Sequence, residues 1–388
     1  MKFRLAAFCA TMLVLCADGA AWARITFSFD FSLDSAGGLF DPRTSSGQQA
    51  QAAVQRAGQD LSDRIVDSLS AISPGGANTW TPRIIDPGSG IEITPSLSGV
   101  GQDVIKVYVG SRSLAVAELG LASAGTATAA GSAAFTDNAA SRGQAGALAT
   151  PKSDYGPWGG SVAFDADTNW YTGLSPGGLT ANKIDLLTVA THELVHLLGF
   201  SIAQPSFAAS VNNGRFTGPN ATAANAGTAP SVIDSHWSGM TSTVGPGGVA
   251  QVALMDPAVQ TGVRRRATLL DWGALDDIGW DIAIPGDANA NGVVDFGDFQ
   301  TLELGFGQTN ARWAQGDFNE DGAIDTADFS LLLRNYGKRM DGTDMPISAA
   351  EQQALSAYAN ALGVPAPEPS LSAAIAGLAM VVMRRRRR

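Results

Sequence analysis

The hydrophobic and polar positions along the chain follow two periods, and these predict its elements. Apolar residues at every second position predict strands in the segments 24–34, 104–109 and 160–165. Apolar residues at helical spacing predict helices in the segments 47–72, 183–198 and 269–280. We therefore expect an α+β fold in residues 24–283, with a mixed twisted sheet and several helices.

Two further segments show neither period. Residues 114–150 are rich in Ala, Gly, Ser and Thr, and we expect loops there. Residues 204–232 contain few large apolar side chains, which predicts a long exposed insertion. The composition then changes sharply at Pro285, so we expect a separate small α-helical module over residues 284–338 and a linker over 339–363.

The composition narrows the class of protein. The chain has 388 residues, 45% of them hydrophobic, so it can bury a sizeable core in more than one domain. Its net charge of −11 disfavours nucleic acid and anionic membranes as partners. The one internal basic run, Arg264-Arg265-Arg266, is expected to be a solvated turn.

The first 23 residues have the features of a secretory signal peptide. A basic start is followed by an apolar run and by the small residues Ala21 and Ala23, which predicts a mature chain starting at Arg24. Cys16 raises the alternative of a lipoprotein, but Leu15 is large for the position before a lipidated cysteine. Both cysteines of the chain, Cys9 and Cys16, lie inside this segment, so we expect a mature protein without disulfides.

The stretch THELVHLLGF carries the strongest chemical signal. His192 and His196 are four residues apart, and on a helix such residues differ by about 40° in direction and about 6 Å in height. Both side chains therefore aim at one point, and Glu193 lies beside them. Zinc lowers the pKa of a bound water to about 7, and Glu193 can take its proton as the water attacks a carbonyl. The motif predicts one catalytic zinc ion; an inert histidine pair is the alternative.

A zinc site of this kind needs a third protein ligand. The chain has three histidines, and the one outside the motif is His236. We expect His236 to complete the site. Asp234 and Asp256 are the alternatives, because carboxylates also bind zinc.

The residues HELVHLLGF resemble the metzincin zinc-protease signature, in which a third histidine stands ten residues after the first. Ile202 occupies that position here. The leishmanolysin-like branch instead places the third histidine beyond an insertion, and His236-Trp237 is similar to that arrangement. The resemblance implies a metzincin-like fold, a methionine turn with Met255 under the metal, and zinc hydrolysis of a protein or peptide substrate.

The resemblance also implies a place for the substrate. Metzincin-like proteases pair an extended peptide with an edge strand, and we expect the strand at Ser161–Phe164 to be that edge, or else a plain strand of the sheet. There is no tyrosine between Met255 and Tyr336 to support an oxyanion. Zinc itself is therefore expected to provide most of that stabilisation.

The segment after Pro285 contains two copies of one pattern, offset by 30 residues. Each copy has oxygen-bearing side chains at loop positions 1, 3, 5, 9 and 12 and Gly at position 6, as in a calcium loop of the EF-hand type. Position 7 supplies a backbone carbonyl. The predicted ligands of two calcium ions are Asp287, Asn289, Asn291, Val293, Asp295 and Asp298 in the first loop and Asp317, Asn319, Asp321, Ala323, Asp325 and Asp328 in the second.

Two departures from a true EF-hand are informative. Position 12 is Asp rather than Glu, and no helix enters the first loop. Both features are similar to the dockerin type I module, a duplicated loop-and-helix unit. This resemblance implies a cohesin-type partner, while a calcium-stapled spacer is the alternative.

The C-terminal residues 364–388 resemble a PEP-CTERM sorting signal. Pro367-Glu368-Pro369 is followed by a short apolar segment and five arginines. The resemblance implies a bacterial cell-envelope protein that is processed by an exosortase-type sorting enzyme; a membrane tail anchor is the alternative.

Together these features predict an exported zinc-dependent endopeptidase with a calcium module and a transient C-terminal membrane anchor. The alternative from another class is a catalytically inactive, calcium-dependent adhesion or scaffold protein of the envelope. The presence of Glu193 favours the enzyme.

Overall fold

The protein was analysed as a computed structural model that describes residues 24–35 and 37–365. The signal peptide expected at 1–23 and nearly all of the sorting signal expected at 364–388 lie outside these residues. Among the described residues, none of the helices has the length and apolar character needed to cross a membrane.

The N-terminal part of the chain is built around a four-stranded sheet with the order β1-β4-β7-β5. The first three of these strands are parallel, and β5 is antiparallel to β7. This is the mixed sheet that the sequence predicted. Its strands are β1 (Thr26–Asp30), β4 (Val104–Arg112), β7 (Gly159–Asp165) and β5 (Gly120–Ala124).

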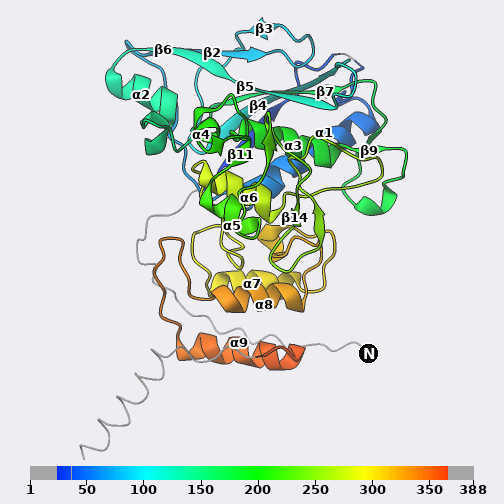
Figure 1. Cartoon of the computed structure of the whole chain (residues 1–388), viewed down its shortest axis with the longest axis vertical. Helices are drawn as coiled ribbons and strands as arrows, with labels where there is room; N and C mark the ends of the chain where they lie inside the picture. The colour runs from blue at the N-terminus through cyan, green and yellow to red at the C-terminus, as the bar shows by residue number, and fades with distance from the viewer. Residues whose placement is uncertain (1–23, 36, 366–388) are drawn as a thin grey trace, which may run out of the picture.

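Each face of the sheet is covered by a different layer. The odd residues of β4, such as Ile105 and Val107, pack into the main core with α1 (Ser45–Ser62) and α3 (Leu186–Leu197). Tyr108 of the same strand belongs to a second cluster with Trp80 of β2. The strand therefore alternates as its period of two predicted, but both of its faces are buried. Figure 1 shows the helices on one side of the sheet and β2 and β6 on the other.

The prediction of loops over 114–150 is wrong. The segment contains β5, β6, α2 and η1, and β6 pairs with β2 in a three-stranded sheet of order β3-β2-β6. Its small residues permit close packing: a Cβ atom on Gly125 would lie 2.2 Å from the ring of Trp158. The elements are β2 (Thr79–Ile85), β3 (Glu92–Ile93), β6 (Thr126–Ala130), α2 (Ala133–Ser141) and η1 (Ala145–Leu148).

The segment 204–232 is a folded insertion, so the prediction that it is exposed is only partly right. Phe207 and Phe216 are fully buried and pack with Phe200 and Trp237. Its α5 packs against α6, the last helix before the C-terminal module. The elements are α4 (Pro205–Ala209), β10 (Val211–Asn212), β11 (Arg215–Phe216), α5 (Pro219–Ala224) and β12 (Val232–Ile233), followed by β13 (His236–Trp237), β14 (Thr241–Thr243), β15 (Ala250–Val252) and α6 (Leu269–Asp277).

The predicted helices are present but shorter than expected. The segment 47–72 contains α1, which ends at Ser62, and the predicted helix 183–198 begins only at Leu186. The residues before it, β9 (Ile184–Asp185), pair with β8 (Trp170–Tyr171). A short η2 (Pro176–Gly178) lies between those two strands in the chain.

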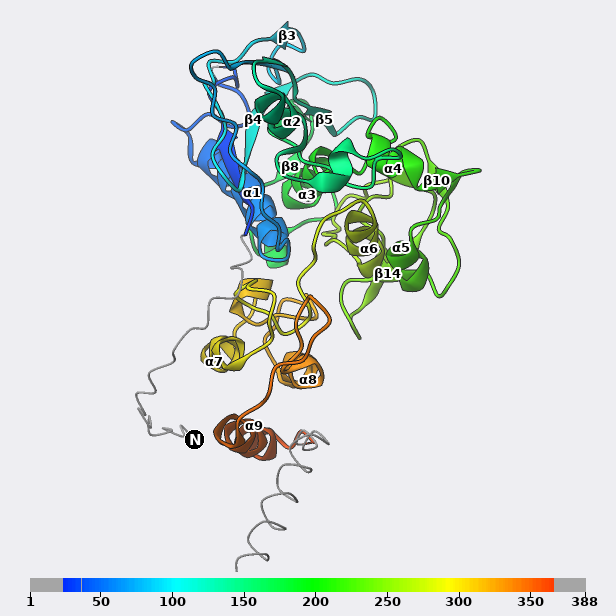
Figure 2. The same cartoon turned by 90° about the vertical axis from the view of Figure 1, so that its left-hand side faces the viewer.

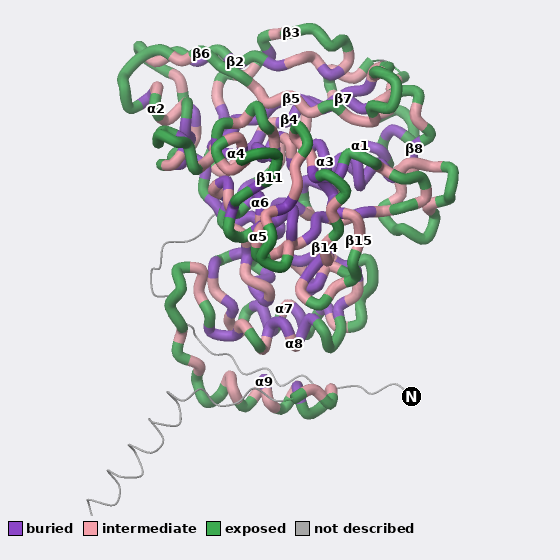
Figure 3. Tube along the Cα trace, in the orientation of Figure 1, coloured by how far each residue is buried: buried purple, intermediate pink, exposed green. Residues whose placement is uncertain are grey.

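A second apolar core belongs to the C-terminal module. It is formed by α7 (Phe296–Gly305), η3 (Trp313–Gln315) and α8 (Thr326–Asn335). The stretch 339–363, expected to be a linker, contains α9 (Ala349–Leu362), whose Leu355 and Ala359 are buried in this core. Figure 2 shows α7 and α8 below the domain that contains the four-stranded sheet, with α9 beyond them, and Figure 3 shows the purple buried trace continuing into the module.

Candidate metal centre

The helix α3 presents His192 and His196 on one side. Asp185 caps its start and accepts a hydrogen bond from the backbone N–H of Thr188 at 3.1 Å. Gly199 follows its last residues with a φ of +104°, a left-handed turn that glycine permits. The helix is buried over nearly its whole length, and His196 is its half-buried position.

The third histidine arrives on a tight hairpin. His236 lies in β13, which pairs with β12, and Asp234 at the turn has a φ of +51°. The next residue, Trp237, is completely buried, and its indole N–H donates to Asp271 at 2.8 Å. The tryptophan therefore anchors the hairpin and fixes the position of His236 beside it.

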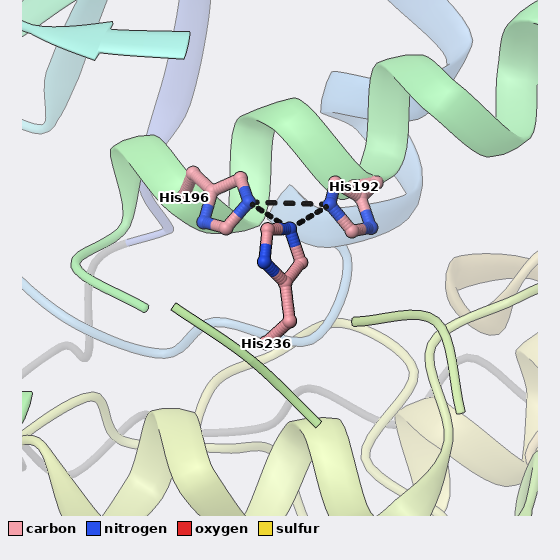
Figure 4. A group of neighbouring side chains, drawn as sticks. All are labelled: His192, His196 and His236. Atoms are coloured by element: carbon pink, nitrogen blue, oxygen red, sulfur yellow. Dashed lines mark hydrogen bonds between the residues drawn. The ribbon is translucent and has the colours of Figure 1, made fainter. Parts of the chain in front are cut away.

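The three imidazoles converge. The Nε2 atoms of His192, His196 and His236 lie 3.2 Å from one another in each of the three pairs. Figure 4 shows the three rings pointing toward one centre from α3 and from the hairpin opposite. Within the described residues this is the one group of three or more His, Cys, Asp or Glu side chains whose ligand atoms all lie within 4.8 Å of one another.

The hydrogen bonds on the far side of two rings determine which nitrogen carries the proton. The Nδ1 atom of His192 lies 2.9 Å from the carbonyl oxygen of Leu254, and that of His196 lies 2.6 Å from the carbonyl of Phe200. A carbonyl only accepts, so each Nδ1 must donate, and each neutral ring then has a lone pair on Nε2. The lone pairs of His192 and His196 thus face each other at 3.2 Å and repel. A cation bound between them would remove this repulsion by accepting both lone pairs.

Burial keeps these rings neutral. It lowers the pKa of His192 well below its ordinary value, and the neighbouring His196 lowers it further. Burial likewise lowers the pKa of His196 to about 4. The pKa of His236 is lowered less, because Asp234 and Asp256 oppose the effect of burial. Neutral imidazole is the form that binds a metal, so the electrostatics and the geometry agree.

Neither aspartate considered as an alternative ligand joins the three histidines. Asp234 is exposed at the hairpin turn. Asp256 accepts hydrogen bonds from the backbone N–H groups of Gly239 and Ala258, both at 3.0 Å. One of its oxygens is therefore used by the turn that follows Met255, and the other by the backbone between β13 and β14.

Glu193 lies between the helix and the sheet. Its Oε2 accepts a hydrogen bond from the backbone N–H of Ala122 in β5 at 2.8 Å. Burial raises the pKa of its carboxyl to about 8, and the charge of Glu118 contributes, while the bond from Ala122 opposes the rise. A Cβ atom on Gly120 would lie 2.6 Å from Oε1, so only glycine leaves room for this carboxylate.

Met255 is completely buried. It directly follows Leu254, whose carbonyl oxygen accepts a hydrogen bond from His192. Its own carbonyl accepts from the N–H of Trp237 at 2.9 Å. Asp271, at the start of α6, accepts from the N–H groups of Leu254 at 3.0 Å and Met255 at 3.2 Å. This buried carboxylate connects the turn at Met255 to the histidine hairpin.

Asp271, Ala122 and Gly120 were not predicted from the sequence as parts of the site. The capping pattern at Thr268 and Asp271 was a readable signal for the start of α6, and the structure confirms a capping box there. No sequence signal connects β5 with Glu193, because that contact depends on the order of the strands.

A cleft of about 710 Å³ passes over the three histidines. Residues of β5 line one side, and Ser235, Pro257 and Val259 line the other. Besides Glu193, the acidic residue in its wall is Glu118. The five successive residues of β5, Gly120 to Ala124, all line the cleft. A cleft that follows a strand in this way suits an extended ligand.

The prediction that Ser161–Phe164 forms the edge of the sheet is wrong. These residues belong to β7, which lies between β4 and β5, and β5 is the edge strand beside α3. Leu119 accepts from, and Gly125 donates to, the backbone of β7. The even residues Gly120, Ala122 and Ala124 therefore direct their backbone groups toward the cleft.

The two predicted calcium loops share one hydrogen-bonding pattern. In the first, Asp287 accepts from Gly292 N–H at 2.9 Å, and in the second Asp317 accepts from Gly322 N–H at 3.0 Å. The aspartate at position 12 accepts from three backbone N–H groups in each loop. The pattern repeats because the sequence repeats.

Burial of the carboxylates suits a cation at these loops. Asp287, Asp298, Asp317 and Asp328 are all completely buried. Burial raises their pKa values, to about 8 for Asp298 and about 7 for Asp317. The Oδ1 atom of Asp317 is buried without a hydrogen-bond partner, which leaves it free to bind a cation.

The loop carboxylates do not converge as the histidines do. Asn289, Asn291 and Asn319 supply part of each predicted set, and Asp298 and Asp328 are turned toward backbone N–H groups. The second loop also brings the side chains of Asn319 and Asp321 together at 3.0 Å. The remaining predicted positions are Asp295 and Asp325, which cap α7 and α8, and the backbone of Val293 and Ala323.

Comparison with known proteins gives two family matches. Residues 130–208 match the family model described as Matrixin, the M10 peptidases, and residues 285–336 match the Dockerin type I domain. No curated protein and no solved structure matches the chain. The first match includes His192, Glu193 and His196 and ends before His236. These matches support a metalloprotease followed by a dockerin module, and the mixed α/β architecture agrees with that order.

Proposed function

We propose that the chain is an exported zinc-dependent endopeptidase, with zinc held by His192, His196 and His236. The observation that carries the proposal is the convergence of three neutral Nε2 atoms in the floor of a cleft. The Matrixin match supports the class of chemistry. The leishmanolysin-like position of the third ligand, beyond an insertion, is part of the proposal.

A bound zinc ion would activate water and polarise the scissile carbonyl. Glu193 is proposed as the general base, because it lines the same cleft as the three histidines and its Oε1 can accept a proton. The bond from Ala122 N–H to Oε2 holds the carboxylate in position. Burial raises its proton affinity, which also suits it to return the proton to the leaving amine.

The chain's own residues would position the substrate. An extended peptide can pair with β5, whose residues Gly120 and Ala124 direct backbone groups into the cleft. This pairing uses no particular side chain. The turn at Met255, held by Asp271, keeps the carbonyl of Leu254 on His192 and so maintains the orientation of that ring.

The proposal is tested on the full-length chain purified with calcium. We expect about one zinc ion per chain and hydrolysis of casein by the wild type. Glu193→Gln should retain zinc and lose about 10²–10⁴-fold in rate, as expected for loss of a general base. His236→Ala should lose both zinc and activity.

The outcomes separate the alternatives. Stoichiometric zinc in His236→Ala would contradict the assignment of the third ligand. Zinc in both the wild type and Glu193→Gln, with hydrolysis by neither against a library of unfolded proteins, would contradict the enzyme and favour a scaffold. Absence of zinc from the wild type would overturn the metal centre.

The proposal also covers export and organisation. We propose a catalytic domain over 24–283 and two calcium ions in the module over 284–338, with sorting through residues 364–388 by an exosortase-type enzyme. Dockerin modules are typical of extracellular proteins, and the Dockerin match supports this location. Mass spectrometry of the secreted chain should give a first residue of Arg24; retention of residues 1–23 would contradict export through this signal.

A further inference from the structure

The second calcium loop contacts the catalytic domain directly. A guanidinium nitrogen of Arg266 lies 3.2 Å from Oδ2 of Asp317 and donates to the carbonyl of Glu320 at 2.7 Å. Asp317 is position 1 of the loop, so this arginine holds one of the predicted ligands. It holds the oxygen that also accepts from Gly322 N–H, and leaves Oδ1 without a partner. Arg266 and a cation can therefore bind the same carboxylate through different oxygens.

A second arginine is enclosed at this junction. Arg64 of the catalytic domain forms an ion pair with Glu320 at 3.2 Å, and its side chain is only 4% exposed. Its guanidinium lies 4.3 Å from the ring centroid of Trp272 on α6 and 4.3 Å from that of Trp313 in the module. A buried arginine between two tryptophans, one from each domain, is typical of an interface that forms stably.

The junction is closely packed. It encloses a cavity of only about 40 Å³. Val66, which follows α1, belongs to the apolar core of the module. Gly245 approaches the second loop so closely that a Cβ atom there would lie 2.4 Å from the carbonyl oxygen of Asn319.

The two loops differ in their contacts with the catalytic domain, although their sequences repeat. The residue at position 4 is Glu320 in the second loop and Ala290 in the first, and both have left-handed backbones, with φ of +57° and +54°. The catalytic domain reaches the first loop through Arg24, which donates to the carbonyl of Ala288 at 3.2 Å. The second loop forms two ion pairs with that domain, from Asp317 to Arg266 and from Glu320 to Arg64.

The contacting segment continues to the helix that carries the zinc motif. Arg264 forms a two-point ion pair with Asp185, the N-cap of α3, at 2.9 and 2.8 Å. The backbone N–H of Arg265 donates to the hydroxyl of Thr188 at 2.8 Å. The expectation that these arginines form a solvated turn is therefore wrong: they connect the second calcium loop to the start of α3.

We propose that the second loop, Asp317–Asp328, is a docking surface for the catalytic domain, and that the calcium ion in this loop keeps the segment 264–266 and the start of α3 ordered. The first loop does not share this role. The inference rests on the calcium binding proposed above and goes beyond it, because it makes the module a structural part of the protease rather than a spacer.

The test compares matched ligand substitutions in the full-length chain with calcium. Asp295→Ala and Asp325→Ala remove the same side chain from position 9 of the two loops, and each also removes one helix cap. Amide hydrogen exchange is measured at Arg265 and Thr188. We expect exchange at both to be roughly tenfold faster or more in Asp325→Ala and unchanged in Asp295→Ala.

A second pair of variants leaves both calcium loops intact. Arg266→Ala should accelerate exchange at Arg265 and Thr188 while two calcium ions remain bound, and Arg334→Ala, on the exposed face of α8, should leave it unchanged. Equal effects of the two loop substitutions, or no effect of Arg266→Ala, would overturn the inference. A wild type that binds no calcium would instead contradict the proposed function, so direct calcium measurement separates the two failures.

Discussion

The Nδ1 atom of His192 lies 2.9 Å from the carbonyl oxygen of Leu254, and this contact fixes the proton on the side of the ring that faces away from the proposed metal. The position of Leu254 depends in turn on Asp271, which accepts from its N–H and from the N–H of Met255. The geometry of the metal centre is therefore maintained by a residue that does not contact it.

The first prediction concerns Asp271. Asp271→Asn preserves shape but replaces one acceptor oxygen with a donor that faces backbone N–H groups. We expect zinc affinity to fall by about 10–100-fold, as is usual for loss of an outer-shell partner. Competition with a chelator measures this. Asp276→Asn, on the same helix, should leave the affinity unchanged; equal affinity of wild type and Asp271→Asn would contradict the role.

The second prediction concerns Gly120. Gly120→Ala places a methyl group 2.6 Å from Oε1 of Glu193, so the carboxylate must move. We expect hydrolysis to fall by at least about tenfold while zinc remains bound, because small displacements of a catalytic group are costly. Rates and zinc content are measured together. Gly75→Ala, where a Cβ meets no atom within 4 Å, is the matched control.

The third prediction concerns the pH dependence of stability. Burial raises the pKa of Asp67 to about 6, and the charges of Asp281 and Asp154 add to the rise, although Gln144 donates to it at 2.8 Å. A carboxyl with a raised folded pKa binds more protons in the native state, so its contribution to stability is lost as pH rises from about 4 to 6.

Asp67→Asn should remove this pH-dependent penalty. We expect it to stabilise the protein at pH 8 by up to about 3 kcal/mol and to have little effect at pH 4, where the aspartate is already protonated. Denaturant unfolding at the two pH values measures the difference. A gain that is the same at both would show that the charge of Asp67 is not responsible.

The fourth prediction concerns calcium and protons. Burial raises the pKa of Asp287 to about 6, of Asp317 to about 7 and of Asp298 to about 8, whereas calcium binds the ionised form. We therefore expect calcium binding to release protons and the dissociation constant to rise at least about tenfold from pH 8 to pH 6. Calorimetry in buffers with different ionisation enthalpies measures the release; a pH-independent constant would contradict it.

The sequence predicted those parts of the fold that have a local cause. The strands predicted at 104–109 and 160–165 and the repeated pattern of the two loops follow from nearby residues, and the structure confirms them. Helix α3 begins later than predicted, because Ile184 and Asp185 pair with β8. That difference comes from a partner strand and could not be read from helical spacing.

The missed parts of the site have long-range causes. Strand β5 consists mostly of small residues, and two of them lie at Glu193: Ala122 donates to its Oε2, and a Cβ atom on Gly120 would lie 2.6 Å from its Oε1. The hydrogen bonds from Trp237 and Leu254 to Asp271 and the ion pair between Arg266 and Asp317 join residues far apart in the chain. The identity of the three clustered histidines could be predicted from the sequence, because the chain contains only three histidines.

The insertion between His196 and His236 has a consequence for how the metal site forms. These two proposed ligands are 40 residues apart in the chain, and the insertion between them is held by the packing of Phe207 on Phe216 and of Phe216 on Trp237. Closing a loop of this length has an entropic cost that the aromatic contacts must offset before zinc can find a third ligand. The complete zinc site that we propose therefore requires the folded insertion, and we expect a chain whose insertion is unfolded to bind zinc more weakly than the native protein.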